Sequence, residues 1–475
     1  MIKTLANLSG LNIGQLALSF GSRISSTLLS FCLLWIASQA LPTNEYGLYV
    51  FLFTVGSLVG LTMPLGQQIL IIKHFHADDH ERGQTNQHIL HTNAVWMCIG
   101  QAILIALAMV IWSLSNHLPT PYNSLHIALL FAAAFALGEY FLNYFRVVGK
   151  IGTSLLPREN VWRALSALAI GVCLWAGYSL NGEQAASLVM LLLFAVVGYQ
   201  GVVFLRCEGW RWARRNHRPT REQSKVLGRE SVFLSLNTLL NACESYLATI
   251  LIGLVIGLEA AALYFVALRI AMLLSLPLSA IDTINIPRIS AQFQANDREK
   301  AQKLIGLHSV LAFGMAFVGF VGLALIGGFI LSLFDPAFGD SKIILLIVAL
   351  QVMTDAFFGP GSWLLMIGGG EKILLKARLV LMACYVALIG CLGFLFGLIG
   401  VAIAAILLNL ATNIFVTRWT MRHWGVDITA TAAFRPFLFG GKRVDGSKTA
   451  HEDAPLQTQT TNKAVVTHTS MSPGE

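Results

Sequence analysis

Charged side chains inside long apolar segments are the residues of this chain best suited to chemistry. A charge in hydrocarbon costs about 2.5 to 3.5 kcal/mol on insertion scales, so such residues mark functional sites or internal ion pairs. Six charged residues lie well inside apolar segments: Arg23, Glu139, Glu244, Arg269, Asp282 and Asp355. At 1.5 Å rise per residue, Arg23 and Arg269 fall about 18 Å and about 14 Å into their segments, which places both near mid-membrane.

The two arginines suit an anionic ligand. A guanidinium group stays protonated in proteins, and its planar donors can grip phosphate oxygens with two parallel hydrogen bonds. We therefore expect Arg23 and Arg269 to face a phosphate group in a water-filled cleft. The alternative is an internal ion pair, for example Arg269 with Glu244 on the neighbouring segment, and the two arrangements could alternate within one cycle.

The acidic residues suggest a second role. Glu139, Glu244 and Asp355 each lie about 20 Å from the start of their segments, deep enough for burial to permit protonation or cation exchange. We interpret these three as candidates for ion coupling. Asp282 lies closer to the cytoplasmic end, near Pro287 and Arg288, and is interpreted as structural.

The elements that must position these residues are membrane-spanning helices. The 475 residues are 56% hydrophobic and 12% charged, with a mean hydropathy of +0.68, a composition that excludes a soluble domain of this size. Apolar stretches of about twenty residues, enough to cross a bilayer as helix, recur along the chain. Twelve spans are predicted, at 12–40, 45–72, 92–114, 124–147, 160–180, 184–205, 230–254, 260–286, 304–333, 341–367, 373–396 and 399–419.

Lysine and arginine fall almost only in every second loop between these spans. The loops with basic residues contain Lys73 and Arg82, Lys150 and Arg158, eight residues within 206–229, four within 288–303, and Lys372, Lys376 and Arg378. Among the alternate loops, only Lys342 is basic. By the positive-inside rule both termini are predicted to be cytoplasmic, in a multi-pass protein of a bacterial inner membrane. The net charge of +8 then indicates contact with anionic membrane lipids rather than with nucleic acid.

A weak internal repeat indicates two similar halves. Residues 48–73 resemble residues 263–288, and a charged turn follows each segment. The predicted organisation is an N-terminal lobe of six helices (1–205), a basic cytoplasmic linker (206–229), a second six-helix lobe (230–420) and a disordered cytoplasmic tail (421–475). Two such lobes would leave a central cleft that could open alternately to each face.

Motifs for cofactors and metals give no site. The run Gly368-Gly369-Gly370 lacks the Gly-Lys-Ser/Thr ending of a phosphate loop, and is interpreted as a tight turn. The histidines of the loop after the second span, His74, His76, His80, His88 and His91, have no defined ligand spacing. We expect no cofactor and no metal.

Three short segments resemble a known family. These are residues 41–49 (LPTNEYGLY), residues 263–269 (LYFVALR) together with Ile286-Pro287-Arg288, and residues 333–338 (LFDPAF). They are similar to segments of bacterial polysaccharide and O-antigen flippases, the Wzx-like branch of the multidrug/oligosaccharidyl-lipid/polysaccharide exporter superfamily. The resemblance covers all twelve spans and excludes the tail.

This resemblance implies an all-α integral membrane protein with two pseudo-symmetric six-helix lobes, as in the drug exporters called MATE. It implies movement of an undecaprenyl-pyrophosphate-linked oligosaccharide from the cytoplasmic to the outer leaflet for cell-surface polysaccharide assembly. Related flippases carry cleft arginines on helices 1 and 8, which fall on Arg23 and Arg269, and Arg146 and Arg163 are further candidates for binding substrate. A polysaccharide polymerase and glycosyltransferases are the implied protein partners.

Two other functions compete with a flippase. A cation-coupled drug antiporter of the same fold would need an acidic centre, against which Arg23 and Arg269 argue. A membrane glycan polymerase or ligase would act on the same lipid-linked substrate. Such enzymes generally place catalytic groups in a substantial outer loop, whereas every predicted outer loop here is short, so we do not expect an enzyme.

Overall fold

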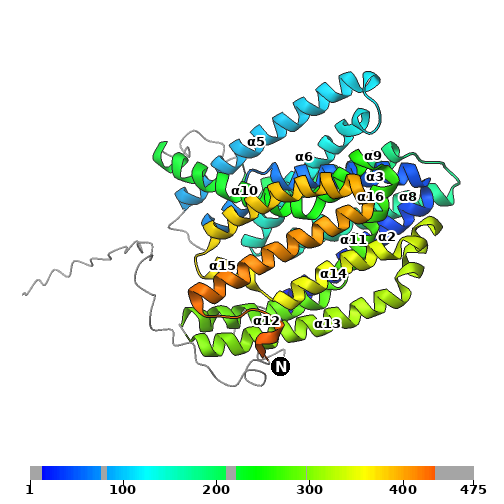
Figure 1. Ribbon diagram of the computed structural model, residues 1–475. Coiled ribbons are helices and arrows are strands. Elements are labelled where there is room, and N and C mark those ends of the chain that lie inside the picture. The colour runs from blue at the N-terminus through cyan, green and yellow to red at the C-terminus, as the bar shows by residue number, and fades with distance from the viewer. Residues whose placement is uncertain (1–12, 76–82, 210–220, 296, 434–475) are drawn as a thin grey trace, which may run out of the picture.

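The protein is a bundle of long helices. The computed structural model describes residues 13–75, 83–209, 221–295 and 297–433, and within these ranges there are helices and connecting turns but no strands (Figure 1). The N-terminal half of the chain forms α2 (Ile13–Ala40), α3 (Thr43–Thr62), α4 (Gln67–His74), α5 (Gly83–Leu114), α6 (Leu125–Val147), α7 (Ile151–Leu155), a π-helical turn (Leu156–Val161), α8 (Trp162–Trp175) and α9 (Gly182–Glu208).

The C-terminal half has a matching series of helices. It forms α10 (Arg221–Val255), α11 (Leu258–Met272), α12 (Ser275–Gln294), α13 (Arg298–Ser332), α14 (Lys342–Phe358), α15 (Gly361–Ile367) and α16 (Glu371–Trp424). Short 3₁₀ turns occur at Ser115–His117, Tyr122–Ser124, Pro336–Ser341 and Ala430–Ala433. Each of the twelve predicted spans coincides with a helix, a broken pair of helices or one arm of α16.

Length and apolarity identify these helices as membrane-spanning. Among the described residues, eight helices are long and apolar enough to cross a bilayer, and the pair α11 and α12, bent by 44°, makes a ninth candidate. One of the eight, α16, is folded back on itself, because Gly397 has φ 59° and breaks the helix into two arms. A Cβ atom on Gly393 would lie 3.2 Å from the Val401 side chain, so the arms meet beside this turn. The predicted all-α membrane fold is confirmed.

Several spans are broken where the sequence contains proline and glycine. Helix α3 ends at Thr62, and the chain passes Pro64 before Leu65 and Gly66 take positive φ angles of 52° and 78°. Proline removes a backbone donor, so an uninterrupted helix cannot pass through this point without losing a bond. Helix α14 ends in the same way at Gly359, with φ 64°, followed by Pro360. Both spans are therefore broken beside a proline and a glycine of positive φ.

The helix boundaries repeat along the chain with a constant offset. The same separation in sequence relates the start of α3 to the start of α11 and the end of α2 to the end of α10. The broken spans also correspond, since α3 and α4 match α11 and α12. This separation equals the one between residues 48–73 and 263–288, the two segments of the weak sequence repeat.

Helix α3 lies at the junction of the two halves. It packs against α6 and α9 of its own half and against α10 and α11 of the other half. Gly47 permits the contact with α11, because a Cβ atom there would lie 2.4 Å from the backbone oxygen of Leu258. The halves are therefore joined through closely packed backbone near the start of α3.

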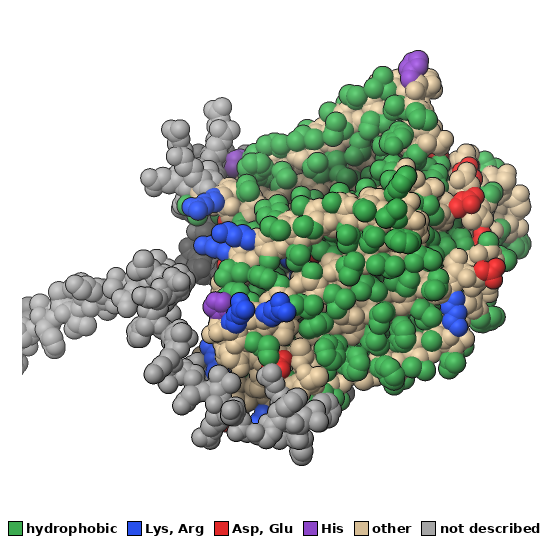
Figure 2. Space-filling model, viewed as in Figure 1, with side chains coloured by type: hydrophobic (Ala, Val, Ile, Leu, Met, Phe, Trp, Pro, Cys, Tyr) green, Lys and Arg blue, Asp and Glu red, His purple; other side chains and the backbone are tan. Residues whose placement is uncertain are grey.

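The two ends of the bundle differ in charge. Lys and Arg side chains gather at the end where α15 meets α16, and Asp and Glu side chains gather at the opposite end (Figure 2). On the face in view, hydrophobic side chains cover the surface between these ends (Figure 2). Such a band, bounded by polar ends, is the surface expected of a protein that crosses a bilayer.

The tail requires a correction. Disorder was predicted from residue 421, but α16 continues to Trp424, and the described residues that follow pack on the bundle. Val426 and Ile428 are each 1% exposed, and Ser309 of α13 donates a hydrogen bond of 2.8 Å to the Ile428 backbone oxygen. These apolar side chains explain why the segment is ordered despite its polar neighbours. Residues 434–475 lie outside the described part.

Candidate functional site

Two predicted arginines line one cavity in the N-terminal half. Arg23 of α2 and Arg146 of α6 border a space of about 600 Å³, together with Glu159 of the π-helical turn. The remaining lining residues are Ser22, Ser26, Ile151, Ser154 and Leu155. We call this space the arginine cavity. Neither Arg23 nor Arg146 forms an ion pair in the part of the chain that the structure describes.

Glu159 faces this cavity but its charge is already engaged. Arg163, one helical turn later, donates a hydrogen bond of 3.0 Å from Nη1 to Glu159 Oε2, and Arg158 Nη1 lies 3.8 Å from Oε1. Pro157 lies in the π-helical turn, an irregularity that is frequent at functional sites. Arg163, a predicted binding residue, thus lies beside the cavity and balances its carboxylate.

Arg158 was assigned to a cytoplasmic loop, and this assignment is wrong. The residue is 2% exposed and forms an ion pair with Glu139 of α6. Its guanidinium group lies 4.0 Å from the centre of the Phe135 ring. The error arose because an arginine near the end of an apolar segment reads as a loop residue when its partner is unknown. Glu139, a predicted ion-coupling residue, is therefore held by an arginine.

Arg269 has an aromatic environment. Its guanidinium carbon lies 4.7 Å from the Phe265 ring centre and 5.7 Å from that of Tyr246, within the range of cation–π attraction. The suggested ion pair with Glu244 is not formed, because Glu244 pairs with Arg378 at 3.1 Å. Arg269 also lies near enough to Arg163 for the two charges to interact.

The charges of this region do not cancel. The group contains five arginines and two glutamates: Arg23, Arg146, Arg158, Arg163, Arg269, Glu139 and Glu159. Each glutamate is bound by an arginine, so positive charge remains in excess. Such an excess in a recess of about 600 Å³ suits an anion with several oxygen acceptors.

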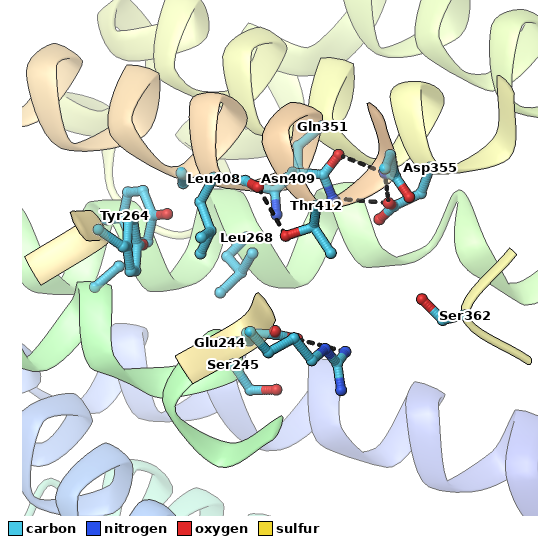
Figure 3. A pocket seen from close by; sticks show the side chains of 15 residues that line it. Glu244, Ser245, Tyr264, Leu268, Gln351, Asp355, Ser362, Leu408, Asn409 and Thr412 are labelled. Atoms are coloured by element: carbon cyan, nitrogen blue, oxygen red, sulfur yellow. Dashed lines mark hydrogen bonds and ion pairs between the residues drawn. The ribbon is translucent and has the colours of Figure 1, made fainter. Parts of the chain in front are cut away.

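A second polar cavity lies in the C-terminal half and has acidic character. It encloses about 200 Å³ and contains Glu244 of α10 and Asp355 of α14 (Figure 3). Asp355 Oδ1 accepts hydrogen bonds of 2.7 Å from Asn409 and 2.8 Å from Asn413, both on the second arm of α16. We call this space the carboxylate cavity. The structure thus brings together two of the three residues predicted for ion coupling and places Glu139 elsewhere.

Neutral side chains complete the carboxylate cavity. Tyr264, Ser245, Thr412 and Ser362 line it, from four different helices (Figure 3). Sequence reasoning missed Asn409 and Asn413, because an asparagine in an apolar segment costs less than a charge and gives a weaker signal. Their spacing of four residues, which places both on one face of a helix, is the signal that could have found them.

Arg378 is a second arginine that was wrongly assigned to a cytoplasmic loop. It lies on α16, lines the carboxylate cavity and donates to Glu244 Oε2 at 3.1 Å and to Asn241 Oδ1 at 2.9 Å. Asp282 pairs with His308 of α13 at 3.2 Å, away from both cavities. That contact agrees with the structural role expected for Asp282.

The short segments that carried the family resemblance contact each other at the acidic end of the bundle. Thr43 donates a hydrogen bond of 2.6 Å to Asp335 Oδ2, and Gln39 donates at 3.1 Å to the backbone oxygens of Leu333 and Phe334. Trp35 Nε1 also donates to Leu333 at 3.0 Å. We call these contacts between α2–α3 and the 333–335 segment the latch. Two of the three segments thus hold the halves together rather than line either cavity.

A family model described as polysaccharide biosynthesis protein matches residues 15–293. The chain belongs to this family. The match includes Arg23, Glu139, Glu159 and Arg269. The family predicted from the three short segments is therefore confirmed.

The chain is also similar in sequence to the probable flippase AglR of Haloferax volcanii. It is 27% identical over 183 residues, which are 38% of this chain and 36% of the relative. The alignment thus spans little more than a third of that protein's length.

Solved structures show the same fold in the superfamily of multidrug exporters. An inward-facing MATE transporter superposes with a TM-score of 0.63 at 18% identity, covering 84% of this chain and 94% of that chain. An outward-facing MATE transporter gives 0.54 at 17% identity, with 85% and 93% covered. A Pyrococcus furiosus transporter, described as having a binding pocket of reverse polarity, gives 0.56 at 16% identity, with 86% and 94% covered. The polysaccharide biosynthesis family member described here therefore has the MATE fold.

Proposed function

We propose that this protein is a flippase that moves an undecaprenyl-pyrophosphate-linked oligosaccharide from the cytoplasmic to the outer leaflet of a bacterial inner membrane. The observation that carries the proposal is the excess of arginine over glutamate around the arginine cavity. A pyrophosphate supplies the oxygen acceptors that guanidinium groups bind in pairs. Membership of a polysaccharide biosynthesis family supports a glycan as the remainder of the substrate.

The substrate explains why a polar cavity within a membrane protein is needed. An isolated ion in hydrocarbon costs tens of kcal/mol by Born estimate, whereas a polyprenyl tail can remain in lipid throughout. A water-filled recess lined with arginines removes most of this cost for the pyrophosphate and sugars. Outward movement of negative charge across an inside-negative membrane also gains about 2.3 kcal/mol per charge per 100 mV.

Charge distribution supports one orientation. The basic end of the bundle would face the cytoplasm, with both termini on that side, and the acidic end would face outward (Figure 2). In this orientation the latch closes the outer end, and the better superposition on the inward-facing transporter supports the same state. Movement of the two six-helix halves about the α3 junction would break the latch and open the cleft outward.

Glu244 and Asp355 support a coupling step in the other half. We propose that a cation returning inward binds or protonates Asp355, whose hydrogen-bond donors in the described structure are the neutral amides of Asn409 and Asn413. Glu139 is less suited to this role, because Arg158 already balances it. We propose a polysaccharide polymerase and glycosyltransferases as protein partners. We also propose that the protein transports its substrate without catalysing a reaction on it.

A drug antiporter is the second candidate, and the carboxylate cavity is the observation that favours it. Acidic groups bind cationic drugs, and this cavity contains two carboxylates against one arginine. Its volume of about 200 Å³ is below the range of about 300 to 1,000 Å³ usual for drug-sized ligands. The larger arginine cavity therefore favours the flippase.

Replacement of Arg23 and Arg269 tests the proposal. Each alanine substitution removes charge-assisted hydrogen bonds worth about 1.5 to 3 kcal/mol, so Arg23→Ala with Arg269→Ala should reduce transport at least about a hundredfold. Transport is measured in proteoliposomes as loss of fluorescent lipid-linked oligosaccharide from the accessible leaflet. Arg422→Ala, at the exposed last turn of α16, is the control. Unchanged transport by the double variant, or expulsion of cationic dyes by the wild type, would contradict the flippase.

A further inference from the structure

A wholly apolar groove lies along α2 and α8, on the outside of the bundle. Leu29, Cys32 and Ile36 form its α2 side, and Ala164, Gly171 and Trp175 belong to its α8 side. The space measures about 390 Å³. Trp175 is 88% exposed, so the groove opens toward the surface that lipid covers. We call it the apolar groove.

The apolar groove follows the arginine cavity along the same two segments of the chain. Both spaces are bordered by α2 and by the α7–α8 segment, and the polar lining of Arg23 gives way to the apolar lining of Cys32 about 14 Å further along α2. Asn160 joins the two segments beside Arg23, because Ser22 donates to its Oδ1 at 3.0 Å and its Nδ2 donates to Ser25. One pair of helices therefore presents cationic lining first and hydrocarbon lining next.

This order matches a single class of molecule, an amphiphile with an anionic head and one long hydrocarbon chain. We propose that the apolar groove binds the polyprenyl chain of the lipid-linked substrate while its diphosphate occupies the arginine cavity; this rests on the proposed function. Small residues make room for the methyl branches of such a chain, since a Cβ atom on Gly171 would still lie 3.8 Å from Ile36. A phospholipid brings two chains to one headgroup, whereas the apolar groove follows one pair of helices from the arginine cavity.

Binding in the apolar groove and the arginine cavity together would fix the position of the diphosphate relative to the polyprenyl chain. The first isoprene units would lie along α2 and α8, and the rest of the chain would extend into lipid beyond Trp175. The chain could then remain in place while the headgroup moves within the polar recess. The groove thereby selects for a polyprenyl carrier independently of the attached sugar.

Cys32 provides a direct test, because it lines the apolar groove and is exposed. The full chain in liposomes is treated with a lipid-soluble alkyl maleimide, and labelling is quantified for each cysteine by peptide mass spectrometry. Undecaprenyl diphosphate should lower labelling of Cys32 about tenfold. It should leave Cys98, an exposed cysteine on α5, unchanged, and phosphatidylglycerol should protect neither.

A variant that fills the apolar groove provides a second test. Gly171→Leu should weaken binding of undecaprenyl diphosphate about tenfold, whereas a geranyl diphosphate headgroup probe, with two isoprene units, should bind unchanged. Gly198→Leu, on the exposed surface of α9 with no atom within 4 Å of its Cβ position, should change neither.

Equal protection of Cys32 by phosphatidylglycerol would overturn the proposal and assign the groove to bulk lipid. Unprotected Cys32 in a preparation that still transports lipid-linked oligosaccharide would also overturn it and leave the flippase intact. Protection of Cys32 without any transport would instead support the chain site and contradict the proposed function.

Discussion

The arginine cavity and the carboxylate cavity are bordered by corresponding helices of the two halves, since α2 and α6 match α10 and α14, but the cavities differ in charge. The offset that relates the helix boundaries of the two halves also relates Arg163 to Arg378 and, to within one position, Glu139 to Asp355. In the N-terminal half the carboxylates are bound by arginines, which leaves Arg23 and Arg146 in excess. In the C-terminal half Asp355 is bound by two amides, so its negative charge is not neutralised by those partners.

One duplicated scaffold can thus hold sites of opposite charge. Arg163 and Arg378 are alike, as are Glu139 and Asp355, but the partners of these residues differ. An arginine bound to a glutamate of its own turn, as Arg163 is to Glu159, removes a negative charge from the first cavity. In the second cavity, Arg378 of α16 pairs with Glu244 of α10. This ion pair does not include Asp355. Composition differs as well, because the same offset places Thr238 and Gly361 opposite Arg23 and Arg146. We infer that partner choice and composition together distinguish an anion site from a cation site here.

The largest effect is expected on stability, at the buried pair beside the arginine cavity. Arg158→Met leaves Glu139 as an uncompensated charge, which should lower the free energy of unfolding by about 3 to 5 kcal/mol. Arg158→Met with Glu139→Gln removes both charges and should recover most of this loss. Denaturant unfolding in mixed micelles measures the stability of both variants. Asp355→Asn, at the position that corresponds to Glu139 in the other half, is compared with them. Equal losses in both halves would break the comparison.

An intermediate effect is expected on coupling. Asp355→Asn keeps the shape of the side chain and its acceptor oxygen for Asn409 and Asn413 but removes the charge. Transport driven by an imposed proton or sodium gradient should fall about tenfold, corresponding to about 1.4 kcal/mol. Substrate binding at the arginine cavity should be retained, as checked by equilibrium binding. An Asp355→Asn protein with full gradient dependence would remove the cation role from the carboxylate cavity.

The smallest effect is expected at the latch, which joins the two halves. Thr43→Val removes the hydrogen bond to Asp335, worth about 1 kcal/mol at a partly exposed site, and should shift the open and closed populations about fivefold. Spin labels at Asn44 and Asp340, both exposed, would report the change as a longer distance at the acidic end. Thr27→Val, which removes a bond within α2 only, is the matched control. An unchanged distance distribution would exclude the latch as a gate.

Much of the fold could be predicted from the sequence, and the reason is the bilayer. Twelve apolar stretches become twelve helical segments, because a spanning backbone must satisfy its own hydrogen bonds and can do so only locally as helix. Breaks at Pro64 and Gly359 follow from the same local rules of backbone geometry. The candidate site was predicted less well. Arg158 and Arg378 were assigned to loops, and Asn409 and Asn413 were missed, since each depends on a partner on another helix.

The helical segments, the positions of the charges within apolar segments and the family of the chain all follow from the sequence alone. These properties depend on local composition and on short segments, so they can be read residue by residue. Three features are seen only in the folded protein: Glu139 is neutralised by an arginine, Asp355 accepts hydrogen bonds from amides, and Arg269 lies against aromatic rings. The physical reason is that the effect of a buried charge depends on what lies within a few ångströms of it, and those neighbours come from helices distant in the chain.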